Sequence, residues 1–251
     1  MSIKELKKGN LEEISGSLSK YVIDSETIVN LGFLNKLNLN SKKKVVVKVS
    51  KISNDIDNEI RIYNILIDNN IIGILDYYSF CRKDGYDMKV LIMKYAEDGS
   101  FGLYNWKSND IEKIKSCIKQ VICSLVDAYI KVGFVHFDLN NNNYVLIKTT
   151  KKEIKYLING KEIIVKIPKN GFETAIMDLE DCEINQNIYK FIKCLDKLFS
   201  RIKDIISIEK EWNQYAINID SKMIELRELS INDNSKNDKL AMRVLEILDI
   251  L

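Results

Sequence analysis

The spacing of apolar residues changes along the chain and predicts a β-rich first part followed by a helix-rich second part. Short apolar runs rich in β-branched residues, such as Lys42–Val49 and Met88–Lys94, are bounded by polar turns, which is typical of strands. From about residue 110 onward, apolar positions recur at intervals of three and four residues, which is typical of amphipathic helices. The pattern therefore predicts an α+β protein.

Helices are predicted in both parts of the chain. One begins near Asn54, a residue type that caps helix N-termini. The clearest runs from Asp110 to Lys131, with one broad apolar stripe and with Gly133 placed to end it. Three apolar stripes in the tail predict further core helices, on either side of a loop at 233–238: Ile188–Ile202, Met223–Leu229 and Leu240–Leu251.

Two β-hairpins are also predicted. The apolar segments Ile71–Phe80 and Met88–Lys94 are expected to pair through a turn at Arg82–Asp87. Farther along, Asn159-Gly160 lies between two apolar runs, and Asn-Gly is a strong signal for a type I′ hairpin turn. The region 151–168 is therefore expected to form a hairpin inserted among the helices.

Composition narrows the class of protein. A chain of 251 residues with 46% hydrophobic and 29% charged residues can form one large globular domain or two lobes. The net charge of +2 gives no basic field that would favour a nucleic-acid partner. Five cysteines without a C-x-x-C pair indicate free thiols in the cytoplasm. We expect no signal peptide, no transmembrane helix and no membrane partner, because no apolar leader and no apolar run of 18 residues is visible.

One stretch carries a recognisable chemical pattern. The only histidine, His136, is followed by Asp138 and Asn143, and then by the apolar run Tyr144–Ile147. The spacing H-x-D-x-x-x-x-N is typical of a phosphoryl-transfer catalytic loop. There an aspartate must meet the acceptor hydroxyl, and an amide oxygen must hold a metal ion at the phosphates. In a chain this rich in asparagine, the residues of this pattern could also form an ordinary turn. Whether the stretch is a catalytic loop therefore depends on the presence of the other kinase motifs.

Three further features follow the order found in protein kinases. Lys48 lies near the end of the run V-V-V-K, Glu59 lies on the next predicted helix, and Asp178 lies in M-D-L-E. On these motifs, about residues 10–205 resemble the protein-kinase-like superfamily, in which a strand lysine, a helix glutamate and a metal-binding aspartate occupy these places. The alternative for Lys48 and Glu59 is a pair of solvent-facing charges on an edge strand and a helix surface.

The resemblance implies a bilobal fold. Residues 1–96 would form a β-rich, nucleotide-binding N-lobe with one helix. Residues 97–251 would form a mainly helical C-lobe that carries the catalytic loop, the inserted hairpin and the helical tail. That lobe would be truncated, because no A-P-E motif occurs and only 73 residues (251 − 178) follow Asp178.

The resemblance also implies ATP and Mg²⁺ as cofactors and assigns a role to each polar residue. Lys48, oriented by Glu59, would hold the α- and β-phosphates of ATP. Asp138 would orient the acceptor hydroxyl and take its proton. His136 would support the loop by hydrogen bonding. The implied metal ligands are Asn143 and Asp178, with Glu180 beside them.

Further positions would contact the nucleotide. Gly16 is the only glycine left of the three in the usual phosphate-covering loop; Gly16 and Ser17 form either a partial phosphate lid or an ordinary hairpin turn. By the same resemblance, Met93 is the gatekeeper at the adenine pocket. The backbone groups of Tyr95 and Ala96 would bind adenine.

The sequence leaves three alternatives for the function: a protein kinase, a small-molecule kinase and a pseudokinase. The long gap before Asp178, with its hairpin, resembles serine/threonine protein kinases of large cytoplasmic DNA viruses, which implies a protein acceptor and, for a viral chain, host cytoplasm or virion. The string D-L-E-D and the short tail resemble aminoglycoside and choline phosphotransferases, which act on small molecules. The sparse glycine loop favours a third alternative, a pseudokinase that only binds partners.

Overall fold

The computed structural model describes residues 19–22, 27–35, 42–51, 54–83, 88–206, 212–231, 233 and 235–250. The lid candidates Gly16 and Ser17 lie outside these residues, as does the tip of the predicted turn at 84–87. The chain divides into two compact units. The first comprises Met1–Ile60 and Leu75–Tyr95, and the second comprises Arg61–Ile74 and Ala96–Leu251.

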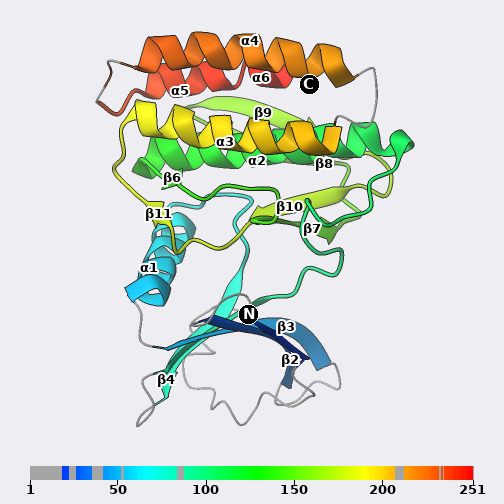
Figure 1. Ribbon diagram of the computed structural model, residues 1–251, viewed down its shortest axis with the longest axis vertical. Coiled ribbons are helices and arrows are strands. Elements are labelled where there is room, and N and C mark those ends of the chain that lie inside the picture. Colours follow the sequence, from blue (N-terminus) through cyan, green and yellow to red (C-terminus); the bar gives the residue numbers. More distant parts are fainter. Residues whose placement is uncertain are drawn as a thin grey trace. The chain divides into compact units, whose positions relative to one another are not determined.

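The first unit is built on a five-stranded antiparallel sheet (Figure 1). Its strands, in spatial order, are β1 (Ser19–Val22), β2 (Thr27–Asn35), β3 (Lys42–Lys51), β5 (Met88–Lys94) and β4 (Tyr77–Lys83). The predicted lysine-bearing strand is therefore central, because β3 pairs with β2 on one side and β5 on the other. At Lys48 the partners are Val29 and Leu91, which excludes the edge-strand alternative.

Helix α1 (Asn54–Asp68) begins at the predicted residue and ends in a turn at Asn69–Asn70. The prediction of a strand over Ile71–Phe80 is wrong in its first half, because β4 begins only at Tyr77. Gly73 has φ +82°, a left-handed conformation that an extended strand does not contain. Its carbonyl accepts a hydrogen bond from the Ile176 N–H at 2.8 Å. The backbone at Gly73 therefore bonds to the end of β10 (Phe172–Ile176) and not to the sheet of the first unit.

In the second unit, helix α2 (Ile111–Val132) is buried on most of its faces. A short 3₁₀ turn, η3 (Ser108–Asp110), leads into it, and Gly133 ends it in the left-handed conformation with φ +64°. Gln120 lies in the middle and is fully buried. Its side-chain amide donates to the Phe172 carbonyl and accepts from the Thr174 N–H, both at 2.8 Å. This buried amide is therefore satisfied and ties the helix to a neighbouring strand.

Three two-stranded antiparallel sheets lie in the second unit. The strand pairs are β7 (Tyr144–Lys148) with β10 (Phe172–Ile176), β6 (Val135–His136) with β11 (Cys182–Glu183), and β8 (Glu153–Ile158) with β9 (Lys161–Lys166). The third pair is the predicted hairpin, and its turn has φ of 48° at Asn159 and 78° at Gly160, as a type I′ turn requires. Alternate residues of β8 are buried, and the strand packs on α2.

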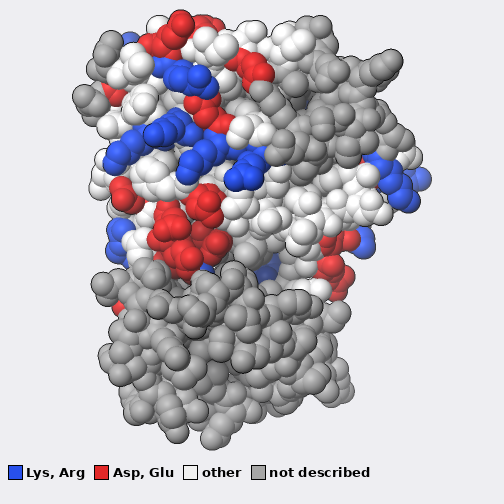
Figure 2. All heavy atoms as spheres, in the orientation of Figure 1, with Lys and Arg blue, Asp and Glu red and all other residues white. Residues whose placement is uncertain are grey.

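The tail forms α3 (Ile188–Ile206), α4 (Trp212–Ser230), α5 (Asp238–Val244) and α6 (Ile247–Ile250). The predicted stripe of α3 is confirmed, and Lys and Arg side chains gather over this helix on its exposed side (Figure 2). A single helix over Leu240–Leu251 is wrong, because a turn at residues 245–246 separates α5 from α6. Among the described helices, none has the length and hydropathy needed to cross a bilayer.

Leu229 is also an incorrect core prediction, since it is 49% exposed. Among the side chains of α4 that the structure describes, 217–230, the buried ones are Ile219, Met223, Leu226 and Ser230, spaced by four, three and four residues. With 3.6 residues per helical turn, residue 230 lies on the same face as Ile219, Met223 and Leu226, and residue 229 lies beside that face. The small buried hydroxyl of Ser230 therefore takes the place that an apolar pattern assigns to leucine.

We predict that Gly133→Ala destabilises the protein more than Gly160→Ala. Both glycines have positive φ, which costs any other L-residue about 1–2 kcal/mol. A Cβ at Gly133 would also lie 2.8 Å from the Asn185 Cα, whereas nothing lies within 4 Å of one at Gly160. Urea unfolding should show a larger loss of free energy for Gly133→Ala, by at least about 1 kcal/mol; equal losses would contradict the packing argument.

Candidate active site

The first unit contains a buried ion pair between Lys48 on β3 and Glu59 on α1. The Lys48 Nζ lies 3.0 Å from a Glu59 carboxylate oxygen, across 11 residues of sequence. Lys48 is 5% exposed and Glu59 is fully buried. The structure thus brings together two residues that the motifs predicted as partners. Burying such a pair costs desolvation energy that an apolar pair would not, so its presence calls for a role other than stability.

The second unit contains the predicted catalytic loop between β6 and β7. The Asn143 side-chain amide donates to the Asp138 carbonyl at 2.8 Å and to its carboxylate at 3.3 Å. The Asn140 amide also donates to this carboxylate, at 3.2 Å. Asp138 itself is exposed and Asn143 is buried. The loop therefore presents an accessible carboxylate whose orientation is set by two amides.

The remaining asparagines hold the loop in place. Asn141 donates to the Arg201 carbonyl on α3 at 2.7 Å and accepts from the Tyr144 hydroxyl at 2.9 Å. Its own carbonyl accepts from the Gly102 N–H at 2.7 Å. A Cβ at Gly102 would lie 2.7 Å from the Asn142 side-chain oxygen. Motif spacing missed Asn140, Asn141 and Gly102, since a run of like residues carries no signal for separate roles.

His136 forms the predicted supporting hydrogen bond. Its ring is fully buried, and Nε2 lies 3.1 Å from the Met177 carbonyl oxygen. Burial lowers the pKa of this imidazole below its usual value, against smaller opposing effects of that hydrogen bond and of nearby carboxylates. Nε2 carries a proton, since only a donor can satisfy the Met177 carbonyl, and burial favours the neutral form of the ring. The backbone carbonyl of His136 accepts from the Cys194 thiol at 3.1 Å.

Asp178 reaches the loop through the β7–β10 ladder. Tyr144 pairs with Ile176, and the Met177 N–H donates to the Asn143 carbonyl at 2.9 Å. Asp178 has φ +63°, a conformation that is uncommon outside glycine and is frequent at functional sites. The turn of the backbone places Asp178 and Glu180 in one segment, and their carboxylate oxygens lie within 4.8 Å of each other.

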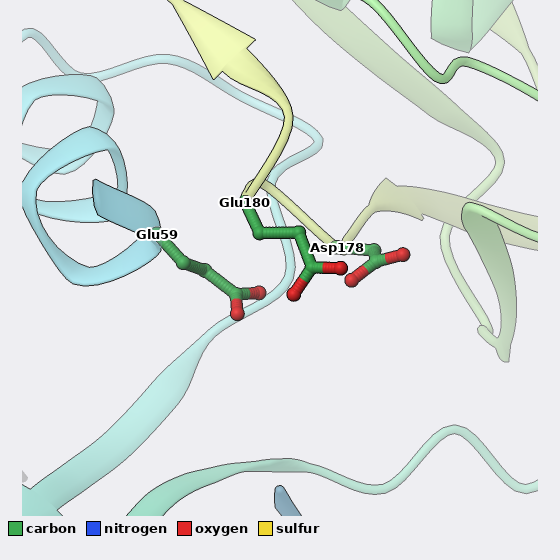
Figure 3. Close-up of side chains that lie close together, drawn as sticks. All are labelled: Glu59, Asp178 and Glu180. Carbon is green, nitrogen blue, oxygen red and sulfur yellow. The ribbon is translucent and has the colours of Figure 1, made fainter. Parts of the chain in front are cut away.

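The close-up in Figure 3 shows Asp178 and Glu180 on the segment after β10. Asp178 and Glu180 are carboxylates, and the Asn143 amide uses its nitrogen toward Asp138, which leaves its oxygen on the opposite side. Carboxylate and amide oxygens are the donors that Mg²⁺ prefers. The three predicted metal ligands therefore fit a magnesium ion by their chemistry.

The predicted adenine-contacting residues lie at and after the end of β5. Met93 is 2% exposed and pairs with Val46 and Tyr77 in the sheet. Tyr95 is half-buried and Ala96 is buried. Their roles as gatekeeper and hinge stay predictions.

Comparison with known proteins supports a protein-kinase-like relationship for part of the chain. No protein-family model matches the sequence. The chain is 33% identical over 112 residues to serine/threonine-protein kinase haspin of Mus musculus, which is 41% of this chain and 15% of that protein. It is 38% identical over 72 residues to haspin of Bos taurus, which is 29% of this chain and 9% of that protein. The chain thus spans a small part of these relatives, and the similarity supports a protein-kinase-like relationship over that part.

We predict that the pKa of His136 is lower in the folded protein than the ordinary value of 6.5. Because its folded pKa is lowered, only the unfolded state takes up the proton as the pH falls through about 6.5. Its contribution to stability is therefore present above that pH, and is lost below it by at most about 1.4 kcal/mol per pH unit.

The measurement is an NMR titration of the imidazole Cε1–H signal, which is single because the chain has one histidine. A titration midpoint at or above 6.5 in the folded protein would contradict the prediction. His136→Asn, which has no such proton, should show a flatter dependence of unfolding free energy on pH between 7 and 5.5.

Proposed function

We propose that this protein transfers the γ-phosphoryl group of ATP to a hydroxyl group, with Mg²⁺ as cofactor and a protein serine or threonine as acceptor. The observation that carries the proposal is the buried Lys48–Glu59 ion pair at 3.0 Å. A cation held on a central strand by a buried carboxylate is suited to bind the α- and β-phosphates of ATP. A purely structural pair at this place would be replaceable by apolar residues at little cost.

The loop of the second unit supplies the groups for the acceptor. The acceptor oxygen attacks the γ-phosphorus, the bond from that phosphorus to the β–γ bridging oxygen breaks, and ADP leaves. Asp138 orients the hydroxyl and takes its proton, because its carboxylate is accessible and held by Asn140 and Asn143. Asn143, Asp178 and Glu180 would hold Mg²⁺, which neutralises charge on the phosphate oxygens when bound.

The protein acceptor rests on the partial similarity to enzymes named serine/threonine-protein kinase. One observation favours the small-molecule alternative: Asp178 and Glu180 lie close together, as the D-L-E likeness to small-molecule phosphotransferases implies. Radiolabelled ATP offered with a generic protein and with small alcohols and amines separates the possibilities. Label in protein supports the proposal, label only in a small molecule supports the alternative, and nucleotide binding without transfer would indicate a pseudokinase.

We also place the activity in the cytoplasm. Four of the five cysteines have described side chains, and all four are buried. Burial raises the pKa of the Cys123 and Cys194 thiols to about 12. Such thiols are unreactive and suit a reducing compartment.

Asp138→Asn should lower kcat by roughly 10²–10⁴-fold, the usual contribution of a positioned proton acceptor. Nucleotide affinity should stay near that of the parent, because Asp138 is assigned to the acceptor. Asp181→Asn is the matched control, since its exposed side chain lies nearby and loses the same charge. Equal effects of the two substitutions on kcat would contradict the role of Asp138.

Lys48→Met combined with Glu59→Gln should abolish phosphotransfer while largely preserving the fold. Lys48→Ala alone is expected to cost about 3–5 kcal/mol, because it leaves a buried carboxylate without its cation. Removing both charges avoids that cost. Urea unfolding measures stability and a phosphotransfer assay measures activity; a stable double variant with parental turnover would refute the assignment of the lysine.

A further inference from the structure

Helix α3 carries a basic stripe, which we define as Lys193, Lys197 and Arg201. The three residues are spaced by four, so they share one face of the helix, and all three are exposed. Figure 2 shows a band of basic side chains over this helix. Like charges four residues apart destabilise a helix, so the stripe costs stability unless a partner compensates it.

The carboxylates near the stripe are engaged elsewhere. Asp196, on the same helix, forms two hydrogen bonds of 2.8 Å with Arg227 of α4. Lys197 donates to the Phe137 carbonyl. Within the described part of the chain, no carboxylate forms an ion pair with any residue of the stripe. The stripe therefore presents positive charge that the described residues do not neutralise.

An amphipathic groove lies beside the stripe, between α3 and α4, with a volume of about 520 Å³. Its apolar lining comprises Phe199, Met223 and Ile224, and Ile224 is 50% exposed. Lys193, Lys197 and Arg227 line the same groove, together with the carboxylates of Asp196 and Asp220. Beside the stripe, the groove suits a ligand that combines an apolar group with negative charge.

The stripe is joined directly to the catalytic loop. The Lys197 ammonium donates to the carbonyl of Phe137, the residue before Asp138. The Arg201 carbonyl accepts from the Asn141 side chain at 2.7 Å. The helix, the groove and the loop all belong to the second unit. A chain bound along the stripe would therefore pass beside the carboxylate assigned to the acceptor.

We propose that the basic stripe and its groove dock an acidic segment of the protein substrate, close in sequence to the acceptor residue. This inference rests on the proposed kinase function. The stripe runs from Lys193 to Arg201, a rise of about 12 Å along the helix, which an extended peptide spans with about four residues. The segment would carry several carboxylates and one large apolar side chain for the groove.

A short peptide fits this surface better than a nucleic acid. Acidic side chains gather next to the basic band in Figure 2, and exposed Asp181 and Glu183 lie on the segment that pairs with the loop. These charges repel a long polyanion. The apolar side chains of the groove also offer a contact that a phosphate group cannot use.

The test compares serine peptides that carry Glu-Glu-Leu-Glu on either side of the serine with peptides that carry Gln-Gln-Leu-Gln. Of the two acidic peptides, the one with the motif on the preferred side of the serine should have a KM at least about fivefold lower than that of its neutral counterpart, as two or three exposed charge pairs would give. The kcat values of the two should be similar. Raising the salt concentration should reduce the difference. Equal KM values for the acidic and neutral peptides would overturn the proposal.

Lys193→Glu combined with Arg201→Glu should remove the preference and leave kcat on the neutral peptide unchanged. The matched control is Lys161→Glu with Lys169→Glu, two exposed lysines on and just after the hairpin. A preference that survives in the stripe variant, or that is lost equally in the control, would overturn the assignment.

Binding without ATP separates this inference from the proposed function. Fluorescence anisotropy of the labelled acidic peptide should show binding that the stripe variant loses, even if no phosphotransfer occurs. Competition by a single-stranded oligothymidylate as strong as that by the unlabelled acidic peptide would overturn the choice of a peptide ligand.

Discussion

The pairing of β7 with β10 is the constraint on which the candidate site of the second unit depends. Asn143 and Asp178 are 35 residues apart (178 − 143). The ladder from Tyr144–Ile176 to Lys148–Phe172, extended by the Met177 N–H to the Asn143 carbonyl, leaves little freedom in their separation. Gln120 holds the far end of β10 from inside α2. A buried helix thus helps to fix the register that brings the backbone at Asn143 next to the backbone before Asp178.

The predicted catalytic loop is supported from several sides by hydrogen bonds. Helix α3 supplies the Arg201 carbonyl and the Cys194 thiol, and Gly102 lies against the asparagine run without a side chain. The loop buries one apolar side chain, that of Leu139, which is 1% exposed, and most of its other residues are polar. Hydrogen bonds from rigid elements add to that burial and leave Asp138 accessible. The same attachment makes the outer face of α3 the natural surface for whatever approaches that residue.

The first unit handles charge in the opposite way. Lys48 and Glu59 are buried between a central strand and a helix, where each compensates the desolvation of the other. The second unit keeps Asp138 exposed and leaves the Asp178 and Glu180 carboxylates partly exposed. A buried pair is rigid, whereas partly exposed carboxylates can exchange water for another ligand. The rigid pair suits the proposed role of Lys48 as a fixed cation that binds phosphate. The more exposed carboxylates suit the proposed roles of Asp178 and Glu180 at the metal and of Asp138 at the acceptor.

By itself, the sequence determined the features that depend on local periodicity and turn chemistry. Helices α1, α2 and α3, the Asn159-Gly160 hairpin and strand β3 follow from apolar spacing, Gly133 and β-branched runs. The likeness of Lys48 and Glu59 to protein-kinase motifs also predicted that these two residues are partners, and the ion pair between them confirms it. Tertiary structure alone decided that residues 71–76 leave the sheet, that the C-terminal stripe breaks into two helices, and that Ser230 is buried where Leu229 was expected. It also decided the roles of Asn140, Asn141 and Gly102, because contacts between residues distant in sequence leave no periodic trace.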